Sequence, residues 1–171
     1  MVEHLIKAGA RVTVTDIVES NIDAAKIKGP VTVVDPATIH AVDCDVFAPC
    51  ALGGGLNPKS IPNIKATVIA GAANNQLENE KIQDEDLRQR GILYAPDYVV
   101  NAGGIISVEA EVHREKVSDA EREAKVLRIG DTLATVFAAS EKQNRPTGEV
   151  ANEMAEDIIR KASERKSVAA E

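Results

Sequence analysis

Apolar and polar positions along the chain form a pattern that predicts strands and helices in alternation. Five short runs are rich in Val, Ile, Thr and Tyr and are bounded by Gly, Pro or Asp, as is typical of buried strands. These runs are RVTVTD (11–16), VTVV (31–34), DVFA (45–48), ATVIA (66–70) and ILYA (92–95). Most are solidly apolar rather than strictly alternating, which indicates a parallel sheet covered by helices on both faces.

Helical spacing fills the segments between these runs. Val2, Leu5 and Ile6 share a helical face, and Gly9 follows as a stop. We predict further helices at 20–28, 58–63 and 78–90, from about 102 onward, and at 118–142 and 148–166. Strands that alternate with helices in this way predict one α/β domain with a Rossmann-like, mostly parallel sheet and C-terminal helices at 118–166.

The chain opens at an unusual point of this pattern. Its first helix leads through Gly9 to a strand that ends in Asp16. In a dinucleotide-binding fold, that helix follows a first strand and a G-x-G-x-x-G turn. Neither precedes Met1, so we expect residues 1–171 to form a partial NAD-binding domain that lacks the first strand and the glycine-rich turn. The open strand edges of such a domain favour association with another chain.

Composition narrows the class of protein. The 171 residues are 44% hydrophobic but only 2% aromatic, so the core must be built from Val, Ile, Leu and Ala. The net charge of −7 argues against a nucleic-acid partner. No apolar run approaches the roughly 18 residues that span a bilayer, and no signal peptide is visible. We therefore expect no membrane partner and a cytoplasmic location.

Metal and disulfide chemistry find little support in the sequence. Cys44 and Cys50 fit neither a C-x-x-C motif nor a disulfide framework. The three histidines are scattered without metal-ligand spacing, and we expect no metal site.

Small and polar residues follow the first and third predicted strands, where loops face the ligand crevice of an open α/β sheet. A carboxylate at Asp16 can accept hydrogen bonds from an adenosine ribose and repel a 2′-phosphate, which favours NAD over NADP. The same residue can equally cap the next turn. The stretch APCALGGG (48–55) lets the backbone approach a flat cofactor, or is a plain glycine turn around a small thiol, Cys50.

The loop after the fourth strand, GAANNQL (71–77), contains two neighbouring asparagines. We expect Asn74 and Asn75 to be buried beside the strand end, where unpaired amides cost free energy. A polar ligand would pair with them, and the alternative is that they cap the next helix or bind neighbouring loops.

The loop after the fifth strand, APDYVVNAGG (95–104), leads into a helix whose N-terminus suits a carboxylate. Asn101 supplies a polar group there, and Gly103 and Gly104 supply permissive backbone. Ile105 and Val108 share a helical face, which suits either an apolar pocket or ordinary core packing.

These loops closely resemble the cofactor-binding domain of the Glu/Leu/Phe/Val dehydrogenases, and their sequence motifs are most similar to those of the leucine dehydrogenases. The resembling segments are DCDVFAPCALGGGLN, IAGAANNQL, GILYAPDYVVNAGGII and, in the C-terminal helices, RIGDTL and RPTGEVANEMAEDII. The resemblance covers residues 1 to about 160. It implies NAD-dependent oxidative deamination of an L-amino acid to its 2-oxo acid and ammonia by a homo-oligomer.

The resemblance also implies residue roles. Those on the cofactor side are Asp16 and Ile17 at the adenosine ribose, Cys50 and Ala51 along the dinucleotide, Ala73 and Asn74 near the nicotinamide ribose, and Asn101 at the carboxamide. Those on the substrate side are Asn75, which hydrogen-bonds the α-amino or carboxylate group, and Gly104, Ile105 and Val108.

One position bears on specificity. Glutamate-specific relatives read N-A-G-G-V-x-V-S, where the serine meets the side-chain carboxylate of the substrate. Here that position is Val108, which cannot pair with a carboxylate, and desolvating an unpaired charge is prohibitive. We expect an apolar amino acid, with leucine and valine favoured. Ser107 replaces the Asn that is common in leucine dehydrogenases at that position.

The family's catalytic lysines lie in an N-terminal substrate domain that this sequence does not contain. Lys59 and Lys65 lack the family's Gly-Gly-Lys context. We therefore assign no catalytic residue and expect this chain alone to be inactive. The alternative reading is a non-catalytic nucleotide-binding or oligomerisation module.

Overall fold

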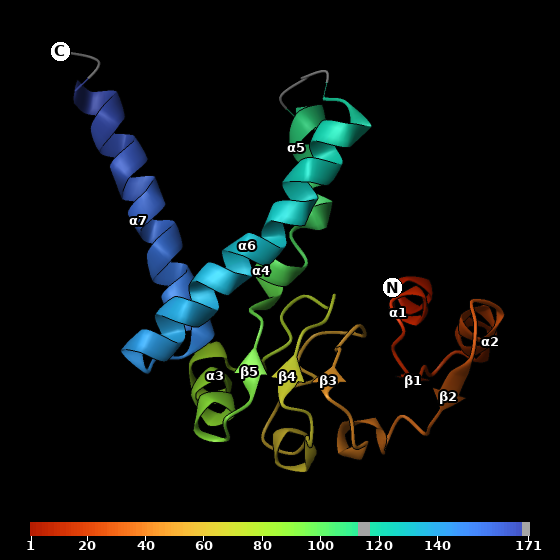
Figure 1. Ribbon diagram of the computed structural model, residues 1–171. Coiled ribbons are helices and arrows are strands. Elements are labelled where there is room, and N and C mark those ends of the chain that lie inside the picture. Colours follow the sequence, from red (N-terminus) through yellow and green to blue (C-terminus); the bar gives the residue numbers. More distant parts are fainter. Residues whose placement is uncertain (113–116, 169–171) are drawn as a thin grey trace.

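The computed structural model describes the backbone of residues 1–112 and 117–168. Helices and short strands alternate along the chain (Figure 1). The strands are β1 (Val12–Val14), β2 (Val31–Val33), β3 (Val46–Phe47), β4 (Val68–Ile69) and β5 (Leu93–Tyr94). The helices are α1 (Val2–Lys7), α2 (Glu19–Ile27), α3 (Glu80–Gln89), α4 (Asp97–Val100), α5 (Gly103–Val112), α6 (Asp119–Gln143) and α7 (Thr147–Val168), with 3₁₀ turns η1 (Ile39–Ala41) and η2 (Ile61–Asn63).

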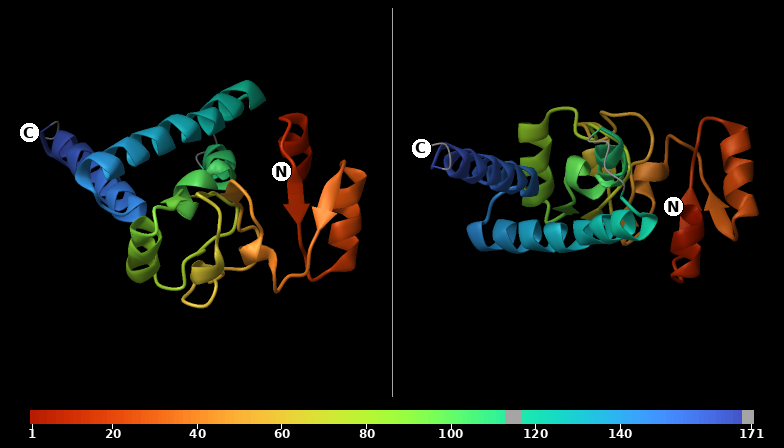
Figure 2. Two further views of the ribbon diagram at one scale, coloured as in Figure 1. Left: turned by 60° about the horizontal axis from the view of Figure 1, so that its bottom comes forward. Right: turned by 90° about the horizontal axis from the view of Figure 1, so that it is seen from above.

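All described strands pair in parallel, which confirms the predicted α/β class. They form two sheets rather than one, with the orders β1-β2 and β3-β4-β5. In all three views, the β1–β2 pair and helix α2 lie at the end of the molecule opposite α7 (Figure 2). The division falls between β1 and β3, which is the place of the first strand in the doubly wound order 3-2-1-4-5-6.

Helix boundaries differ from the predicted ones where Pro, Gly and Asn intervene. The helix expected at 58–63 is only the 3₁₀ turn η2, which contains Pro62. The helix expected from about 102 forms as α5, and a short helix that was not predicted, α4, precedes it after Pro96, which lies at its N-cap. Asn101 ends α4, and Gly103 begins α5.

The two C-terminal helices form as predicted, and their ends show why. A capping box between Ser118 and Glu121 begins α6, and the left-handed Asn144 ends it. Helix α7 begins directly after Pro146.

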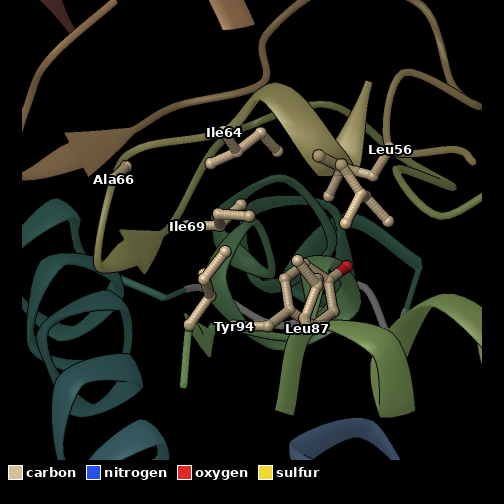
Figure 3. Close-up of a cluster of buried hydrophobic side chains, with 8 residues drawn as sticks. Leu56, Ile64, Ala66, Ile69, Leu87 and Tyr94 are labelled. Atoms are coloured by element: carbon tan, nitrogen blue, oxygen red, sulfur yellow. The ribbon is translucent and has the colours of Figure 1, made fainter. Parts of the chain in front are cut away.

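The hydrophobic core lies around the three-stranded sheet and α3 (Figure 3). Leu56, Ile69 and Leu87 have no exposed surface, and Tyr94 packs in the same cluster. Around the β1–β2 pair, in contrast, Ile22 is the one buried apolar side chain among the described residues. The packed sheet is therefore the rigid base for the loops that follow β3, β4 and β5.

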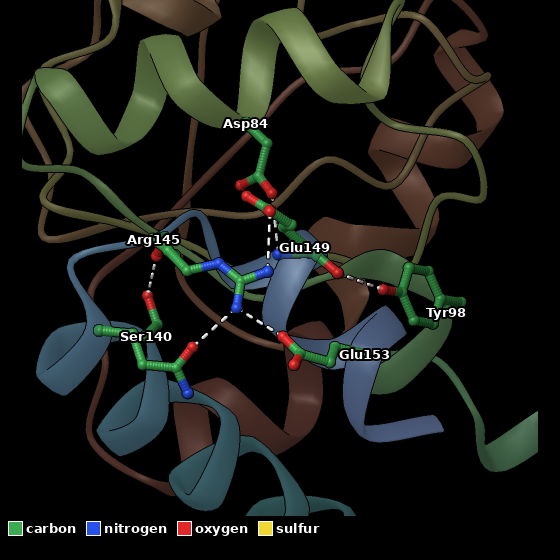
Figure 4. A network of polar contacts seen from close by, with 8 residues as sticks. Asp84, Tyr98, Ser140, Arg145, Glu149 and Glu153 are labelled. Atoms are coloured by element: carbon green, nitrogen blue, oxygen red, sulfur yellow. Dashed lines mark hydrogen bonds and ion pairs between the residues drawn. The ribbon is translucent and has the colours of Figure 1, made fainter. Parts of the chain in front are cut away.

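A buried carboxylate joins α7 to this base. Asp84 of α3 is only 4% exposed, and its Oδ2 accepts a hydrogen bond of 2.8 Å from the Gly148 amide at the start of α7. The Thr147 hydroxyl donates to the Tyr94 carbonyl at 2.7 Å. Arg145 pairs with Glu149 and Glu153 on the first turns of α7 (Figure 4). Burial raises the pKa of Asp84 to about 6 from an ordinary value of 3.8.

This raised pKa predicts a specific pH dependence of stability. The folded state favours protonated Asp84, so its contribution is fully present below the unfolded pKa of 3.8 and is lost as pH rises through about 6. Asp84→Asn stays neutral and keeps an acceptor for the Gly148 amide. Between pH 4 and pH 7 the variant should therefore gain about 2–3 kcal/mol relative to the wild type.

Urea unfolding of both proteins across this pH range measures the difference. Asp131→Asn, at an exposed position of α6, controls for the loss of one negative charge. An unchanged difference between Asp84→Asn and wild type at all pH values would show that the buried carboxylate is ionised in the folded state throughout.

Candidate functional site

The loops that follow β3 and β4 form one unit through backbone hydrogen bonds. The Gly54 amide donates to the Asn75 carbonyl at 2.8 Å, and the Leu56 amide donates to the Gln76 carbonyl at 2.9 Å. An isolated parallel bridge joins Leu56 to Leu77. These contacts extend strand-like pairing beyond the ends of β3 and β4.

Two glycines allow this close approach. A Cβ on Gly71 would lie 2.1 Å from the Pro49 carbonyl oxygen, and one on Gly53 would lie 2.8 Å from the Asn75 carbonyl oxygen. Side chains at these positions would therefore meet backbone rather than a movable side chain. Gly53, which belongs to the stretch that the sequence suggested for cofactor approach, therefore packs one loop on the other, as does Gly71.

The loop after β5 joins the same unit through two side chains. The Asp97 carboxylate accepts a hydrogen bond of 2.8 Å from the Gln76 amide. The Asn101 Nδ2 donates to the Asn74 Oδ1 at 2.6 Å. Asn74 and Asn75, which follow β4, and Asn101, which follows β5, therefore come together at the carboxyl ends of two neighbouring strands, as the sequence predicted.

One expectation about this loop is wrong. Asn74 and Asn75 are exposed, and the buried amide of GAANNQL is Gln76, which is 1% exposed. The loop turns outward at Asn75, whose φ of +51° lies in the left-handed region that Asn tolerates better than most residues. The two asparagine side chains thus face outward, where a ligand can reach them.

Helix α5 presents an apolar surface beside these amides. Ile105 is 73% exposed and Val108 is 50% exposed, so core packing does not account for either residue. A Cβ on Gly104 would meet no atom within 4 Å, which leaves open space at the start of the helix. Ser107 donates to the Gly103 carbonyl within its own helix at 2.9 Å.

Asp16 and Ile17 lie apart from these loops, after β1 of the two-stranded sheet. The Asp16 carboxylate accepts hydrogen bonds from the Val18 amide at 2.8 Å and from the Asn21 Nδ2 at 2.9 Å. The bond from Val18, followed by that from Asn21, lowers the pKa of Asp16. This is the capping arrangement, and ribose binding by the exposed Asp16 stays a prediction.

The loop after β3 lies close to the start of α1. The exposed Cys50 places its Sγ 3.9 Å from the Met1 Sδ. Ala51 is exposed beside it, and Ala73 is buried in the loop after β4.

Gln76 and Asp97 also belong to this site, although the sequence did not single them out. Gln76 had no local signal, because it lies between two asparagines and a single apolar residue, Leu77, in a polar stretch. Asp97 had none, because only the folded chain brings its carboxylate to the Gln76 amide.

Residues 1–112 and 117–168 give no support for two other kinds of site. No group of three or more His, Cys, Asp or Glu side chains in this part of the chain is arranged to hold a metal ion. No helix in it is both long and apolar enough to cross a membrane.

Comparisons with known proteins identify the family. The family described as Glutamate/Leucine/Phenylalanine/Valine dehydrogenase matches residues 3–166. The chain is 42% identical over 168 residues to L-tryptophan dehydrogenase of Nostoc punctiforme, covering 97% of this chain and 46% of the relative. It is 44% identical over 156 residues to leucine dehydrogenase of Geobacillus stearothermophilus, covering 91% of this chain and 42% of the relative.

Structural comparison agrees. The crystal structure of L-tryptophan dehydrogenase from Nostoc punctiforme superposes with a TM-score of 0.89 at 41% identity, covering 94% of this chain and 48% of that one. The chain therefore belongs to the Glutamate/Leucine/Phenylalanine/Valine dehydrogenase family, a family of amino-acid dehydrogenases. It spans about half the length of the relatives it matches.

The close approach at Gly71 yields a prediction about stability. Gly71→Ala places a methyl group against the Pro49 carbonyl, so the two loops must separate. We expect a loss of about 1–3 kcal/mol in the free energy of unfolding, as for other overpacked positions. Gly130→Ala on α6 is the matched control, because its Cβ meets no atom within 4 Å and alanine favours a helix.

Urea denaturation of both variants measures the two effects. Gly71→Ala with the stability of the wild type would mean that the loops after β3 and β4 are not packed as described.

Proposed function

We propose that this chain forms the cofactor-binding part of an NAD-dependent dehydrogenase that converts an apolar L-amino acid to its 2-oxo acid and ammonia. The observation that carries this proposal is the meeting of Asn74 and Asn101 beside the exposed Asn75, next to the apolar surface of α5. Amides that face outward next to an apolar wall suit a ligand with a polar head and an apolar side chain.

The residues present fit a dinucleotide. Cys50, Ala51 and Ala73 are small enough for a flat cofactor to approach the loops, and Asn74 and Asn101 supply amides for the nicotinamide end. Asp16 would accept hydrogen bonds from the adenosine ribose, beside the exposed Ile17. When bound, NAD would supply the acceptor for the hydride that leaves the Cα of the substrate.

The substrate would lie between Asn75 and helix α5. Asn75 would hydrogen-bond the α-amino or carboxylate group, and the open backbone at Gly104 leaves room for it. Ile105 and Val108 would cover the apolar side chain, and neither can pair with a charged one. A leucine or valine side chain is favoured, although a pocket discriminates by only about 1–3 kcal/mol per methylene.

The names of the relatives support an apolar substrate. Leucine, valine and L-tryptophan dehydrogenases are among them, and each is named for an amino acid with an uncharged side chain. We further propose that turnover needs catalytic lysines from chain outside these 171 residues, and that the protein works in the cytoplasm as a homo-oligomer. The length of the relatives, about twice that of this chain, supports the first of these points.

A non-catalytic nucleotide-binding or oligomerisation module is the second candidate. The observation that favours it is the division of the strands into two sheets, which leaves the facing edges of β1 and β3 unpaired with each other. An unpaired edge is a template for a strand from another chain.

Cofactor choice tests the main proposal. We expect NAD to bind with a Kd in the high micromolar range or weaker, about −5 kcal/mol or less favourable. NADP should bind more weakly, because Asp16 would repel its 2′-phosphate. Asp16→Asn keeps the acceptor for the Val18 amide and should reduce the preference for NAD. Calorimetry with both cofactors measures this, and equal affinities in the wild type would contradict the role of Asp16.

A further inference from the structure

Gln76 is the most deeply buried polar side chain of the loop after β4. Its Nε2 donates two hydrogen bonds, to the Gly71 carbonyl at 2.9 Å and to the Ala73 carbonyl at 3.0 Å. Its backbone amide donates to Asp97, and its backbone carbonyl accepts from the Leu56 amide. One residue thus contacts both ends of the turn and all three loops.

Among the described residues, the side-chain amide of Gln76 forms hydrogen bonds through its N–H donors and not through its oxygen. Gln76 Oε1 is buried and has no hydrogen-bond partner within the described part of the chain. Reversing the amide would turn this oxygen toward two carbonyl oxygens, so the orientation is fixed by the Nε2 contacts. A buried acceptor without a partner is unfavourable, which means that the two donated bonds are what the residue contributes.

The donated bonds control the segment that carries Asn74 and Asn75. The Ala73 carbonyl, which Gln76 holds from inside, also faces the Asn101 Nδ2 at 3.4 Å. Immediately after it come Asn74, paired with Asn101, and Asn75, in its left-handed conformation. A sparsely populated conformation persists only where the surrounding structure holds it in place. Gln76 helps to hold this turn from its buried side through the bonds to Gly71 and Ala73.

We propose that Gln76 is a positioning residue, which holds the 71–75 turn so that the Asn74 and Asn75 side chains meet the cofactor and the substrate. The inference rests on the proposed function for the identity of the ligands. Its geometric content, the dependence of the turn on two donated hydrogen bonds, stands apart from that function.

Two variants of the full chain test this role. Gln76→Met keeps the length of the side chain and removes both donors. Gln76→Glu can donate one hydrogen bond when its carboxyl is protonated and none when it is ionised. Burial, the two facing carbonyls and the neighbouring Asp97 all favour the protonated form. At mildly acidic pH the introduced carboxyl of this variant should therefore donate its hydrogen bond, and at mildly alkaline pH that bond should be lost.

The expected result is a loss of NAD affinity of about tenfold or more for Gln76→Met. Gln76→Glu should bind nearly as the wild type at mildly acidic pH and about tenfold more weakly at mildly alkaline pH, each compared with the wild type at the same pH. The side-chain amide resonances of Asn74 and Asn101 should shift in the same conditions. Because this comparison uses one folded protein at two pH values, it holds even if Gln76→Met fails to fold.

Gln83→Glu is the matched control. Gln83 is 2% exposed, and its Oε1 accepts a hydrogen bond of 2.5 Å from the Asn79 amide, so a carboxylate keeps that contact. Its NAD affinity relative to the wild type should not change with pH.

Each outcome has one meaning. Unchanged NAD affinity and unchanged Asn74 and Asn101 resonances in the Gln76 variants would overturn the positioning role. A wild-type chain that binds no NAD would overturn the proposed function, and the amide resonances would then decide the role of Gln76 without any ligand.

Discussion

The site depends on the close backbone approach of the loop after β4 to the loop after β3. No side chain fits between Gly71 and the Pro49 carbonyl, and none fits between Gly53 and the carbonyls of Asn74 and Asn75. With the side chains excluded, the amides of Gly54 and Leu56 reach the carbonyls of the other loop. Flexible glycine-rich segments thereby become a fixed surface, on which polar side chains can be held in defined places.

The base beneath this surface explains how the loops are carried. Leu56, Ile69, Leu87 and Tyr94 pack in one cluster, so the β3 loop, β4, α3 and β5 share one hydrophobic core. Behind them, Asp84 and Thr147 join the start of α7 to α3 and β5. The C-terminal helices therefore brace the side of the sheet away from β1. The β1–β2 pair has no comparable core, and the Asp16 part of the site is correspondingly less tied to the rest.

Much of the fold follows from the sequence, because strong local signals agree with the tertiary structure. The apolar runs placed all five strands, and helical spacing placed the two long helices, whose adjoining ends lie on either side of Pro146. The sequence predicted that the first strand is absent, but it did not predict that the remaining strands form two separate sheets. Strand pairing is a long-range property, and short runs such as Val46–Phe47 do not show which neighbours they lack.

The site was predicted less completely, for a physical reason. Loops at the carboxyl ends of parallel strands must lie together, so the meeting of Asn74 and Asn101 followed from topology. Which amide points inward depends on the turn itself, and here the left-handed Asn75 exposes both asparagines and buries Gln76. The contact of Asp97 with Gln76 joins residues 21 positions apart and has no local signature.

The most direct test of the account is an NMR titration of the chain with NAD, followed by L-leucine. The account predicts that backbone amide shifts on addition of NAD concentrate at Ala51, Ala73, Asn74 and Asn101, and that leucine then shifts Asn75, Gly104 and Val108. Shifts that concentrate instead around the hollow lined by Pro58, Pro62 and Gln89, beside η2 and α3, would contradict it.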